Sequence, residues 1–232
     1  MPFVHLFGIN ASMDPRIVAE NTIMTLLGPV TGDPKVLNDA VSLATILVAA
    51  DGGANVAVDA NLKLDAVIGD MDSITAETRA ALAESAVIHV HEQETTDFEK
   101  CLQRVSADVI LAVGFLGGRI DHSLSTFNVL SRFPEQPVIL VGDEDIVFLA
   151  PPRIELALPV GTRISLFPFA PLKGHSVGLN WPIDGIAFRP DTKIGVSNST
   201  NKANVSLSFD TQKMFVILPT EFLNNVIAAL RT

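Results

Sequence analysis

The chain has 232 residues, of which 48% are hydrophobic, and a mean hydropathy of +0.37, a composition that supplies a core and argues against disorder. Its formal net charge of -10 opposes binding to nucleic acid or to an anionic membrane surface. A single cysteine, Cys101, rules out an intramolecular disulfide and fits a reducing cytoplasm. The first ten residues lack a basic segment followed by a long apolar stretch, so we expect no signal peptide. No window approaches the roughly 20 apolar residues of a membrane span. We therefore expect a cytoplasmic protein.

Strands and helices alternate through the first 150 residues. Apolar, β-branched runs predict strands at 22–27, 45–50, 64–68, 87–90, 109–115 and 138–141. Helical spacing predicts helices at 34–43, with Asp33 as N-cap, and at 75–84, 97–105 and 121–132. This alternation predicts an α/β fold: a three-layer, Rossmann-like domain whose mostly parallel sheet is covered on both faces.

The pattern changes near Pro151 and Pro152. Beyond them, short apolar runs such as 163–167 and 205–209 are separated by Pro, Gly, Asn and Asp. The run at 205–209 alternates apolar residues with serine, as a half-buried antiparallel strand does. We therefore predict a boundary at about residue 150, with an α/β catalytic domain at 1–150 and an all-β sandwich domain at 151–232 that closes with a short helix at 221–230.

Four short acidic segments stand at the ends of predicted strands or the starts of predicted helices. They are DGGAN at 51–55, GDMDS at 69–73, TDFEK at 96–100 and GGRIDH at 117–122. In an open α/β sheet the strand ends form the rim where ligands bind. Carboxylates do not bind a polyphosphate directly, but they hold the divalent cation that does. Together the segments predict a site for a metal ion and a nucleotide.

The GDMDS segment carries the sharpest metal signal. Asp70 and Asp72 are two residues apart, so on an extended chain both carboxylates point to the same side. Two carboxylates plus substrate phosphates are a suitable ligand set for Mg²⁺. A turn without a ligand is the alternative, since Gly, Asp and Ser all favour turns.

The two glycine-pair segments suit phosphate contact. In DGGAN, Gly52 and Gly53 allow the backbone to approach a ligand closely, and a helix is predicted to start near Asn55. In GGRIDH, Arg119 offers a bidentate fork and Asp121 is the predicted N-cap of the following helix. Ligand-free β-to-α turns explain both segments as well.

The TDFEK segment fits a capping box, with Thr96 as N-cap and Glu99 at the third helical position. Asp97 then lies in the first turn, where the helix dipole lowers the pKa of a carboxylate. The cap alone explains Thr96 and Glu99. It does not explain why Gln93, Asp97 and Lys100 gather near other strand ends, so Asp97 remains a candidate for function.

Other candidates are weaker. His89 and His91 have the spacing of some metal sites but no third ligand nearby, so zinc is not expected. Cys101 is predicted to be a buried small hydrophobe rather than a nucleophile. The sequence contains no Walker A, GxGxxG, protein-kinase or GxSxG motif.

In this order, the four segments resemble the signatures of the thiamin pyrophosphokinase family. The likeness continues in Gly178-Leu-Asn-Trp181 and Gly195-Val-Ser-Asn198, and it covers roughly residues 20 to 218. It implies transfer of pyrophosphate from ATP to the hydroxyl group of thiamin, which gives thiamin diphosphate and AMP. It also implies a homodimer whose active sites lie between subunits.

Carried over by motif, the resemblance assigns roles to individual residues. Mg²⁺ would be held by Asp70 and Asp72 with Asp51, and Asp97 and Asp121 complete the predicted catalytic set. Asp97 would either accept the hydroxyl proton or attract the thiazolium cation, and the second role is favoured because a first-turn aspartate should be a weak base. Residues near ATP would be Asp51, Gly52, Gly53, Asn55, Gly117, Gly118, Arg119 and Asp121. Residues near thiamin would be Gln93, Asp97, Trp181, Ser197 and Asn198.

Three other readings stay open. A diphosphokinase acting on another alcohol, such as a pterin, would keep the acidic segments but replace Trp181, Ser197 and Asn198. A nucleotide sensor without turnover would lose at least one carboxylate. A sugar-nucleotide transferase would leave Asp51 and Asp121 without a task. For Trp181 itself, burial in the sandwich core is the alternative to stacking on a ligand.

Overall fold

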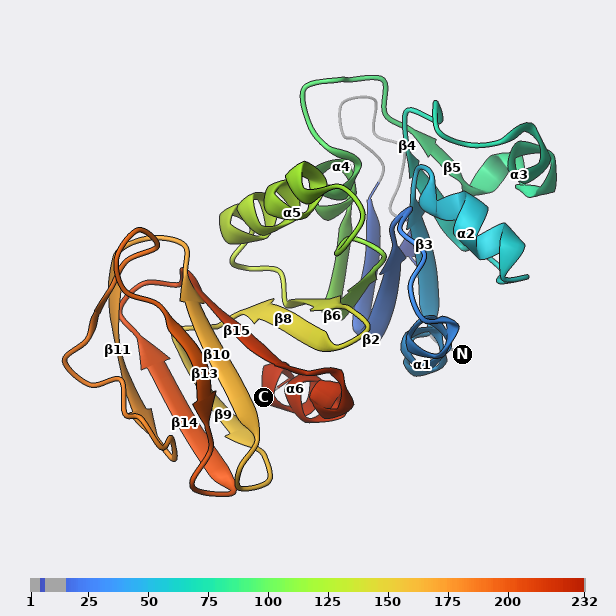
Figure 1. The fold of residues 1–232 in the computed structure, drawn as a ribbon. Helices are drawn as coiled ribbons and strands as arrows, with labels where there is room; N and C mark the ends of the chain where they lie inside the picture. The colour runs from blue at the N-terminus through green and yellow to red at the C-terminus, as the bar shows by residue number, and fades with distance from the viewer. Residues whose placement is uncertain (1–4, 7–15, 232) are drawn as a thin grey trace. The chain divides into compact units, whose positions relative to one another are not determined.

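The structure is a computed structural model that describes residues 5–6 and 16–231 (Figure 1). These residues pack into two compact units, the first containing residues 5–6, 16–129 and 140–143 and the second residues 130–139 and 144–231. The boundary at residue 150, as a limit between independent domains, stays a prediction. The expected absence of a signal peptide concerns residues 1–10, most of which lie outside the described range.

The first unit is built on a parallel sheet with the strand order β6-β2-β3-β4-β5, and the short β1 pairs antiparallel with β2. Helices α1, α2 and α3 lie on one face and α4 and α5 on the other (Figure 1). This confirms the predicted α/β fold with a mostly parallel sheet. The strands are β1 (His5–Leu6), β2 (Ile17–Leu27), β3 (Ile46–Ala50), β4 (Ala66–Gly69), β5 (Val87–His89), β6 (Val105–Val113) and, shared with the second unit, β7 (Val138–Val141). The helices are α1 (Pro34–Leu43), α2 (Gly53–Asp59), α3 (Ala76–Ala81), α4 (Asp97–Leu102), α5 (Ile120–Arg132) and the short 3₁₀ helix η1 (Glu84–Ala86).

The bounds of α1 and β7 agree with the sequence prediction, and the Asp33 side chain accepts a hydrogen bond from the Lys35 amide at 2.8 Å as an N-cap. Strand β2 begins five residues earlier than predicted. Its register against β6 shifts between Ala19 and Ile23, and Asn21 has a φ of 57° there. The polar residues that interrupt the apolar pattern lie in this bulge, so the strand continues on both sides of it. Helix α4 is shorter than predicted because β6 already begins at Val105.

The order in which successive strands are added to the sheet changes direction beside β2. Successive strands run from β2 to β5 along one side, and β6 then returns to the other side of β2. In such sheets a ligand binds outside the carboxyl ends of the strands at this switch point. The two strand ends are held together by backbone hydrogen bonds from Gly28 N to Val113 O at 2.7 Å and from Val30 N to Gly114 O at 3.1 Å. The structure therefore predicts a ligand site above β2 and β6.

Close packing at this rim requires glycine at position 53. A Cβ atom on Gly53 would lie 2.1 Å from the carbonyl oxygen of Leu27, whereas one on Gly52 would meet nothing nearer than 3.4 Å. We expect Gly53→Ala to lower the free energy of unfolding by about 2 kcal/mol, because the backbone of β2 must move. Urea denaturation of both variants checks this. Equal stability of Gly53→Ala and Gly52→Ala would contradict it.

The second unit contains two antiparallel sheets, with strand orders β13-β10-β15-β8 and β12-β11-β14-β9. Along β14 the alternate residues Val205, Leu207 and Phe209 are buried, as the sequence pattern predicted. The all-β sandwich is confirmed, whereas β8 was not predicted. Its elements are β8 (Asp145–Leu149), β9 (Arg153–Ala157), β10 (Arg163–Pro168), β11 (Leu172–Val177), β12 (Ala187–Phe188), β13 (Gly195–Ser199), β14 (Asn204–Phe209), β15 (Met214–Pro219), η2 (Thr220–Phe222) and α6 (Leu223–Leu230).

Within residues 5–6 and 16–231, every helix is too short or too polar to cross a bilayer.

Candidate active site

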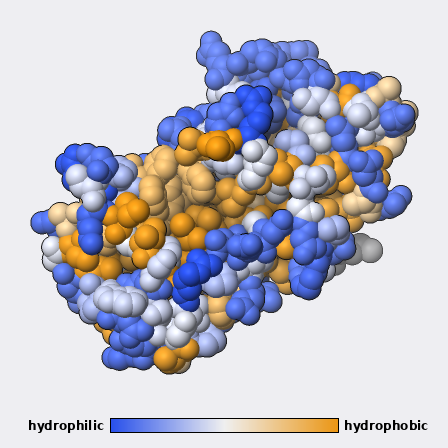
Figure 2. Space-filling view, viewed as in Figure 1, coloured by the Kyte–Doolittle hydropathy of each residue, from blue (hydrophilic) through white to orange (hydrophobic). Residues whose placement is uncertain are grey.

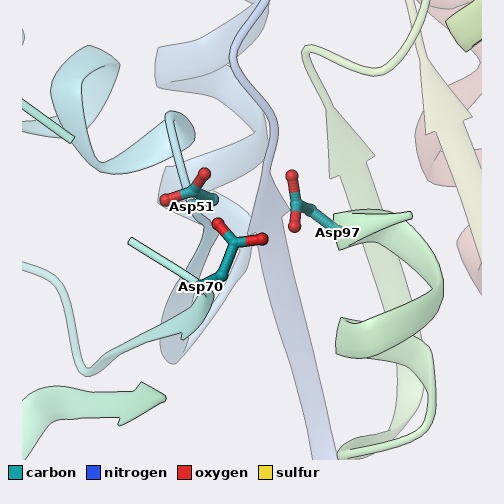
Figure 3. A group of neighbouring side chains, drawn as sticks. All are labelled: Asp51, Asp70 and Asp97. Carbon is teal, nitrogen blue, oxygen red and sulfur yellow. The ribbon is translucent and has the colours of Figure 1, made fainter. Parts of the chain in front are cut away.

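Three aspartates meet at the rim of the parallel sheet (Figure 3). Asp51 follows β3, Asp70 follows β4 and Asp97 opens α4. One carboxylate oxygen from each lies within 4.8 Å of the others. We call Asp51, Asp70 and Asp97 the aspartate cluster. The structure thus brings together predicted residues from three of the four acidic segments.

Local backbone geometry places these carboxylates side by side. The amide of Asp51 donates to Ile68 O at 2.9 Å, which ties the end of β3 to β4. A Cβ atom on Gly69 would lie 2.7 Å from the Cβ of Asp51, so glycine is needed at 69 for this approach. Asp51 and Met71 adopt φ values of 36° and 67°, and the chain turns sharply after both strands.

Asp51 is the buried member of the cluster, with 1% of its surface exposed. Its Oδ2 accepts a hydrogen bond from the Ser73 amide at 3.3 Å, whereas its Oδ1 is buried without a partner among the described residues. Burial, followed by the charge of Asp97, raises its pKa to about 6. A buried carboxylate with an unsatisfied oxygen beside two further carboxylates matches the ligand set of a hard divalent cation.

Lys100 is the functional candidate that the sequence prediction left out of the site. Its side chain is 2% exposed, and its Nζ donates to Asp70 Oδ2 at 3.0 Å and to Asp97 Oδ1 at 3.1 Å. Gln93 Nε2 also donates to Asp70 Oδ2, at 2.7 Å. The signal in the sequence was the three-residue spacing from Asp97, which puts Lys100 on the same helix face.

The pKa values of two cluster members are shifted in opposite directions. Burial acts to raise the pKa of Asp70, but the hydrogen bonds from Lys100, the Asp72 amide and Gln93 outweigh it and lower the pKa. For Asp97, burial raises the pKa despite the hydrogen bond from Lys100. The predicted lowering of the Asp97 pKa by the helix dipole is therefore wrong, because desolvation is the larger effect.

A cleft of about 310 Å³ opens beside the cluster. Asp72 lines it, but this residue is exposed, and its Oδ1 accepts from Ser73 Oγ at 2.9 Å. Asp72 lies outside the aspartate cluster. The sequence prediction had Asp72 as the third carboxylate beside Asp51 and Asp70, whereas in the structure this third carboxylate is that of Asp97. Predicted site residues that line the cleft are Gly52, Asp70, Asp72, Gln93, Asp97 and Gly117.

A larger cavity of about 580 Å³ adjoins the cleft within the first unit, and the two share Val30, Gly114 and Gly117. Gly117 and Gly118 have φ values of 87° and 62°, which few residues other than glycine adopt. The carboxylates of Asp33 and Asp143 lie at the cavity as well. The glycine turn after β6 thus forms a common wall of both spaces.

Arg119 and Asp121 form an exposed ion pair instead of facing the cluster. Arg119 Nε and Nη2 lie 3.1 and 2.6 Å from the two oxygens of Asp121, and this pairing lowers the pKa of Asp121 to about 2. The predicted N-cap role of Asp121 is wrong, because α5 begins at Ile120 and Asp121 lies inside its first turn. Asn55 likewise makes structural contacts, donating to Ser73 O at 2.9 Å and accepting from the Thr75 amide at 3.1 Å.

Trp181 lies in the second unit and is 63% exposed, which rules out the alternative that it is a core residue. Asn198 fixes its backbone: Nδ2 donates to Trp181 O at 2.7 Å, and Oδ1 accepts from Trp181 N at 3.2 Å. A cavity of about 570 Å³ is lined by Trp181, Ser197, Asn198 and the apolar residues Ile183, Ile186 and Phe188. Figure 2 shows hydrophobic side chains exposed on this unit, at the left of the view.

The burial predicted for Cys101 is confirmed, and no observation tests the expectation for the histidine pair. Cys101 is fully buried, and burial raises the pKa of its thiol. The rings of His89 and His91 stack with centroids 4.0 Å apart. Among the described residues, the aspartate cluster is the one group of three or more potential metal ligands, so no third ligand joins the histidine pair.

From the raised pKa of Asp51 we predict how the stability of the metal-free protein depends on pH. Since its folded-state pKa of about 6 exceeds the ordinary value of 3.8, the folded protein binds more protons and loses stability as pH rises through this window. In chelator at pH 8, we therefore expect Asp51→Asn to melt at a higher temperature than wild type, with the difference shrinking at pH 5. Added Mg²⁺ should stabilise wild type only. Thermal unfolding checks this, and a lower melting temperature for the variant at pH 8 would contradict it.

Comparison with known proteins agrees with the geometry. Residues 37–142 match the family model described as thiamin pyrophosphokinase, catalytic domain. Thiamine pyrophosphokinase 1 of Oryza sativa is 29% identical over 209 residues, covering 75% of this chain and 79% of the relative, and the Caenorhabditis elegans thiamin pyrophosphokinase 1 is 25% identical over 233 residues, covering 90% and 95%. The crystal structure of yeast thiamin pyrophosphokinase has a TM-score of 0.73 at 15% identity and covers 98% of both chains. All four acidic segments lie within the matched stretch, so residues 37–142 form a domain of the thiamin pyrophosphokinase catalytic type on this shared fold.

Proposed function

We propose that this protein transfers pyrophosphate from ATP to the hydroxyl group of thiamin, giving thiamin diphosphate and AMP, with Mg²⁺ held by aspartates at strand ends. The match to this catalytic domain supports the formation of thiamin diphosphate. The observation that carries the metal assignment is the buried, unpartnered Oδ1 of Asp51 beside Asp70 and Asp97. These carboxylates fit Mg²⁺, which takes oxygen ligands and usually completes its shell with water and substrate phosphates.

Asp51, Asp70 and Asp97 would hold the ion, and Asp72 would face it from the rim of the cleft. Bound there, Mg²⁺ would neutralise the charge on the phosphoryl oxygens of ATP. Asp121 keeps its proposed role near ATP only if its pair with Arg119 opens, because both side chains are engaged with each other.

ATP fits the paired spaces of the first unit. The triphosphate would lie over the 310 Å³ cleft beside the cluster, and the nucleoside in the adjoining 580 Å³ cavity. Gly114 and Gly117, which line both spaces together with Val30, have no side chains, so their backbone amides would be open to phosphate. The predicted Gly52, Gly53, Asn55, Gly117 and Gly118 would contribute backbone surface and shape rather than charge.

Asp97 also lines the cleft together with Gln93. Its negative charge there would attract the thiazolium cation of thiamin. In the proposed reaction, the thiamin hydroxyl oxygen attacks the β-phosphorus of ATP, its proton passes to solvent, and AMP leaves. Aligning oxygen and phosphorus supplies much of the remaining rate enhancement.

The cavity at Trp181, Ser197 and Asn198 is the proposed thiamin pocket, in which the aminopyrimidine ring would stack on the exposed indole. The family resemblance further supports a homodimer with active sites at the subunit interface. The net charge of -10 would disfavour nucleic acid and anionic membranes as partners while attracting a cationic acceptor. A cytoplasmic location remains part of the proposal.

Incubation with ATP, Mg²⁺ and thiamin tests the proposal, with AMP and thiamin diphosphate as the expected products. ADP in place of AMP would exclude pyrophosphoryl transfer. AMP released only with another alcohol, such as a pterin, would favour a different diphosphokinase. ATP binding without any product would favour a nucleotide sensor.

A further inference from the structure

We propose that Lys100 takes the place of a second cation in the aspartate cluster, so that each chain binds one divalent ion rather than two. The inference rests on the proposed metal-binding role of the cluster. It assigns Lys100 as a positioning residue, which acts through the carboxylates that it holds.

Lys100 Nζ lies between two carboxylates, 3.0 Å from Asp70 Oδ2 and 3.1 Å from Asp97 Oδ1. A second metal ion in a two-metal site would bridge carboxylates from such a position. Because the lysine side chain is 2% exposed, its ammonium group is built into the site and does not alternate with solvent.

Lys100 leaves the other side of the cluster open. Gln93 Nε2 and Lys100 Nζ both donate to Asp70 Oδ2, so this oxygen already has two donors. Asp51 has no hydrogen bond to Lys100, and its buried Oδ1 has no partner among the described residues. The free coordination capacity therefore lies on the Asp51 side, away from the ammonium group.

The charges of the site also balance for a single ion. The three carboxylates contribute -3 and Lys100 contributes +1, which leaves -2 for one divalent cation to neutralise. A second divalent ion would leave a net charge of +2 in a partly buried site, and uncompensated buried charge is costly. Removing the lysine charge would leave -3 and make a second ion favourable.

A fixed ammonium group differs from a second ion because it cannot dissociate. It keeps Asp70 and Asp97 facing each other when no metal is bound, whereas three unpaired carboxylates would repel one another. The cluster is thereby prepared to receive its single ion without rearrangement.

Counting bound Mn²⁺ by electron paramagnetic resonance, with the full chain and no nucleotide, tests the inference. We expect one Mn²⁺ per chain for wild type and two for Lys100→Met, which is one atom shorter than lysine and carries no charge. Lys35→Met is the matched control, because Lys35 pairs with Asp39 at 2.5 Å on an exposed helix face. It should leave the count at one.

Two bound ions in wild type, or one in folded Lys100→Met, would overturn the inference, since a purely structural lysine would change stability but not the count. If Lys100→Met fails to fold without metal, wild type and Lys100→Arg decide: one ion in each is expected, and two in either overturns it. If wild type forms thiamin diphosphate but binds two ions, this inference is contradicted and the proposed function stands. If wild type binds one ion but forms no thiamin diphosphate, the proposed function is contradicted and this inference stands.

Discussion

Asp70→Asn is expected to reduce thiamin diphosphate formation about 10³-fold while leaving the fold intact, a loss typical of removing a group that stabilises developing charge. Asp70 is the most connected member of the aspartate cluster, since it accepts hydrogen bonds from Lys100, Gln93 and the Asp72 amide. An amide at this position removes the charge that the metal ion and Lys100 share. Product formation at saturating Mg²⁺ and ATP measures the effect, and circular dichroism checks the fold.

Asp39→Asn is the matched control for this prediction. Asp39 is also paired with a lysine, Lys35, but it lies on the exposed surface of α1 and lines neither the cleft nor the adjoining cavity. The same chemical change there should leave activity within about twofold, because exposed ion pairs contribute little. Near-normal activity of Asp70→Asn would contradict the metal assignment.

Asp72→Asn separates the sequence prediction from the structure. The two-residue spacing gave Asp70 and Asp72 equal roles, whereas the structure leaves Asp72 exposed and outside the cluster. We therefore expect a smaller loss for Asp72→Asn, about 10- to 100-fold, as is usual for residues that act on a metal indirectly. A larger loss than in Asp70→Asn would reverse this ranking.

The sequence predicted those features of the site that depend on local structure. Asp33 and Thr96 cap their helices as their spacing indicated, and the acidic segments lie at the ends of β3 and β4 because apolar strands stop there. Parallel strands then bring these ends to one edge without further information. The order of the segments along the chain was enough to indicate the family.

Features that depend on tertiary packing were beyond such reasoning. The burial of Lys100 between Asp70 and Asp97 requires knowing how α4 packs against β4, thirty residues away in the chain. The raised pKa of Asp97 follows from desolvation, which the helix-dipole argument omits. The sequence suggested that the Arg119 guanidinium contacts phosphate. In the structure it instead pairs with the carboxylate of Asp121, two residues further along the chain.

Trp181→Ala is expected to raise the KM for thiamin about 5- to 150-fold, the range that loss of one aromatic stacking partner of about 1–3 kcal/mol produces. Two observations support this. The indole is 63% exposed, so it contributes little to the core and is available to a ligand. Its backbone is held at both the amide and the carbonyl by Asn198, so the ring is presented at low entropic cost.

Steady-state kinetics that vary thiamin and ATP separately check this prediction, because the KM for ATP should be unchanged. Trp181→Phe should recover much of the loss, since a smaller ring still stacks on a flat heterocycle. Val160→Ala is the matched control: Val160 is 66% exposed in the same unit but does not line the cavity, so its truncation should leave both KM values unaltered. An equal rise in both KM values for Trp181→Ala would mean that the residue supports the fold of the second unit rather than the acceptor. Thiamin would then have to be recognised by the first unit, through Gln93 and Asp97.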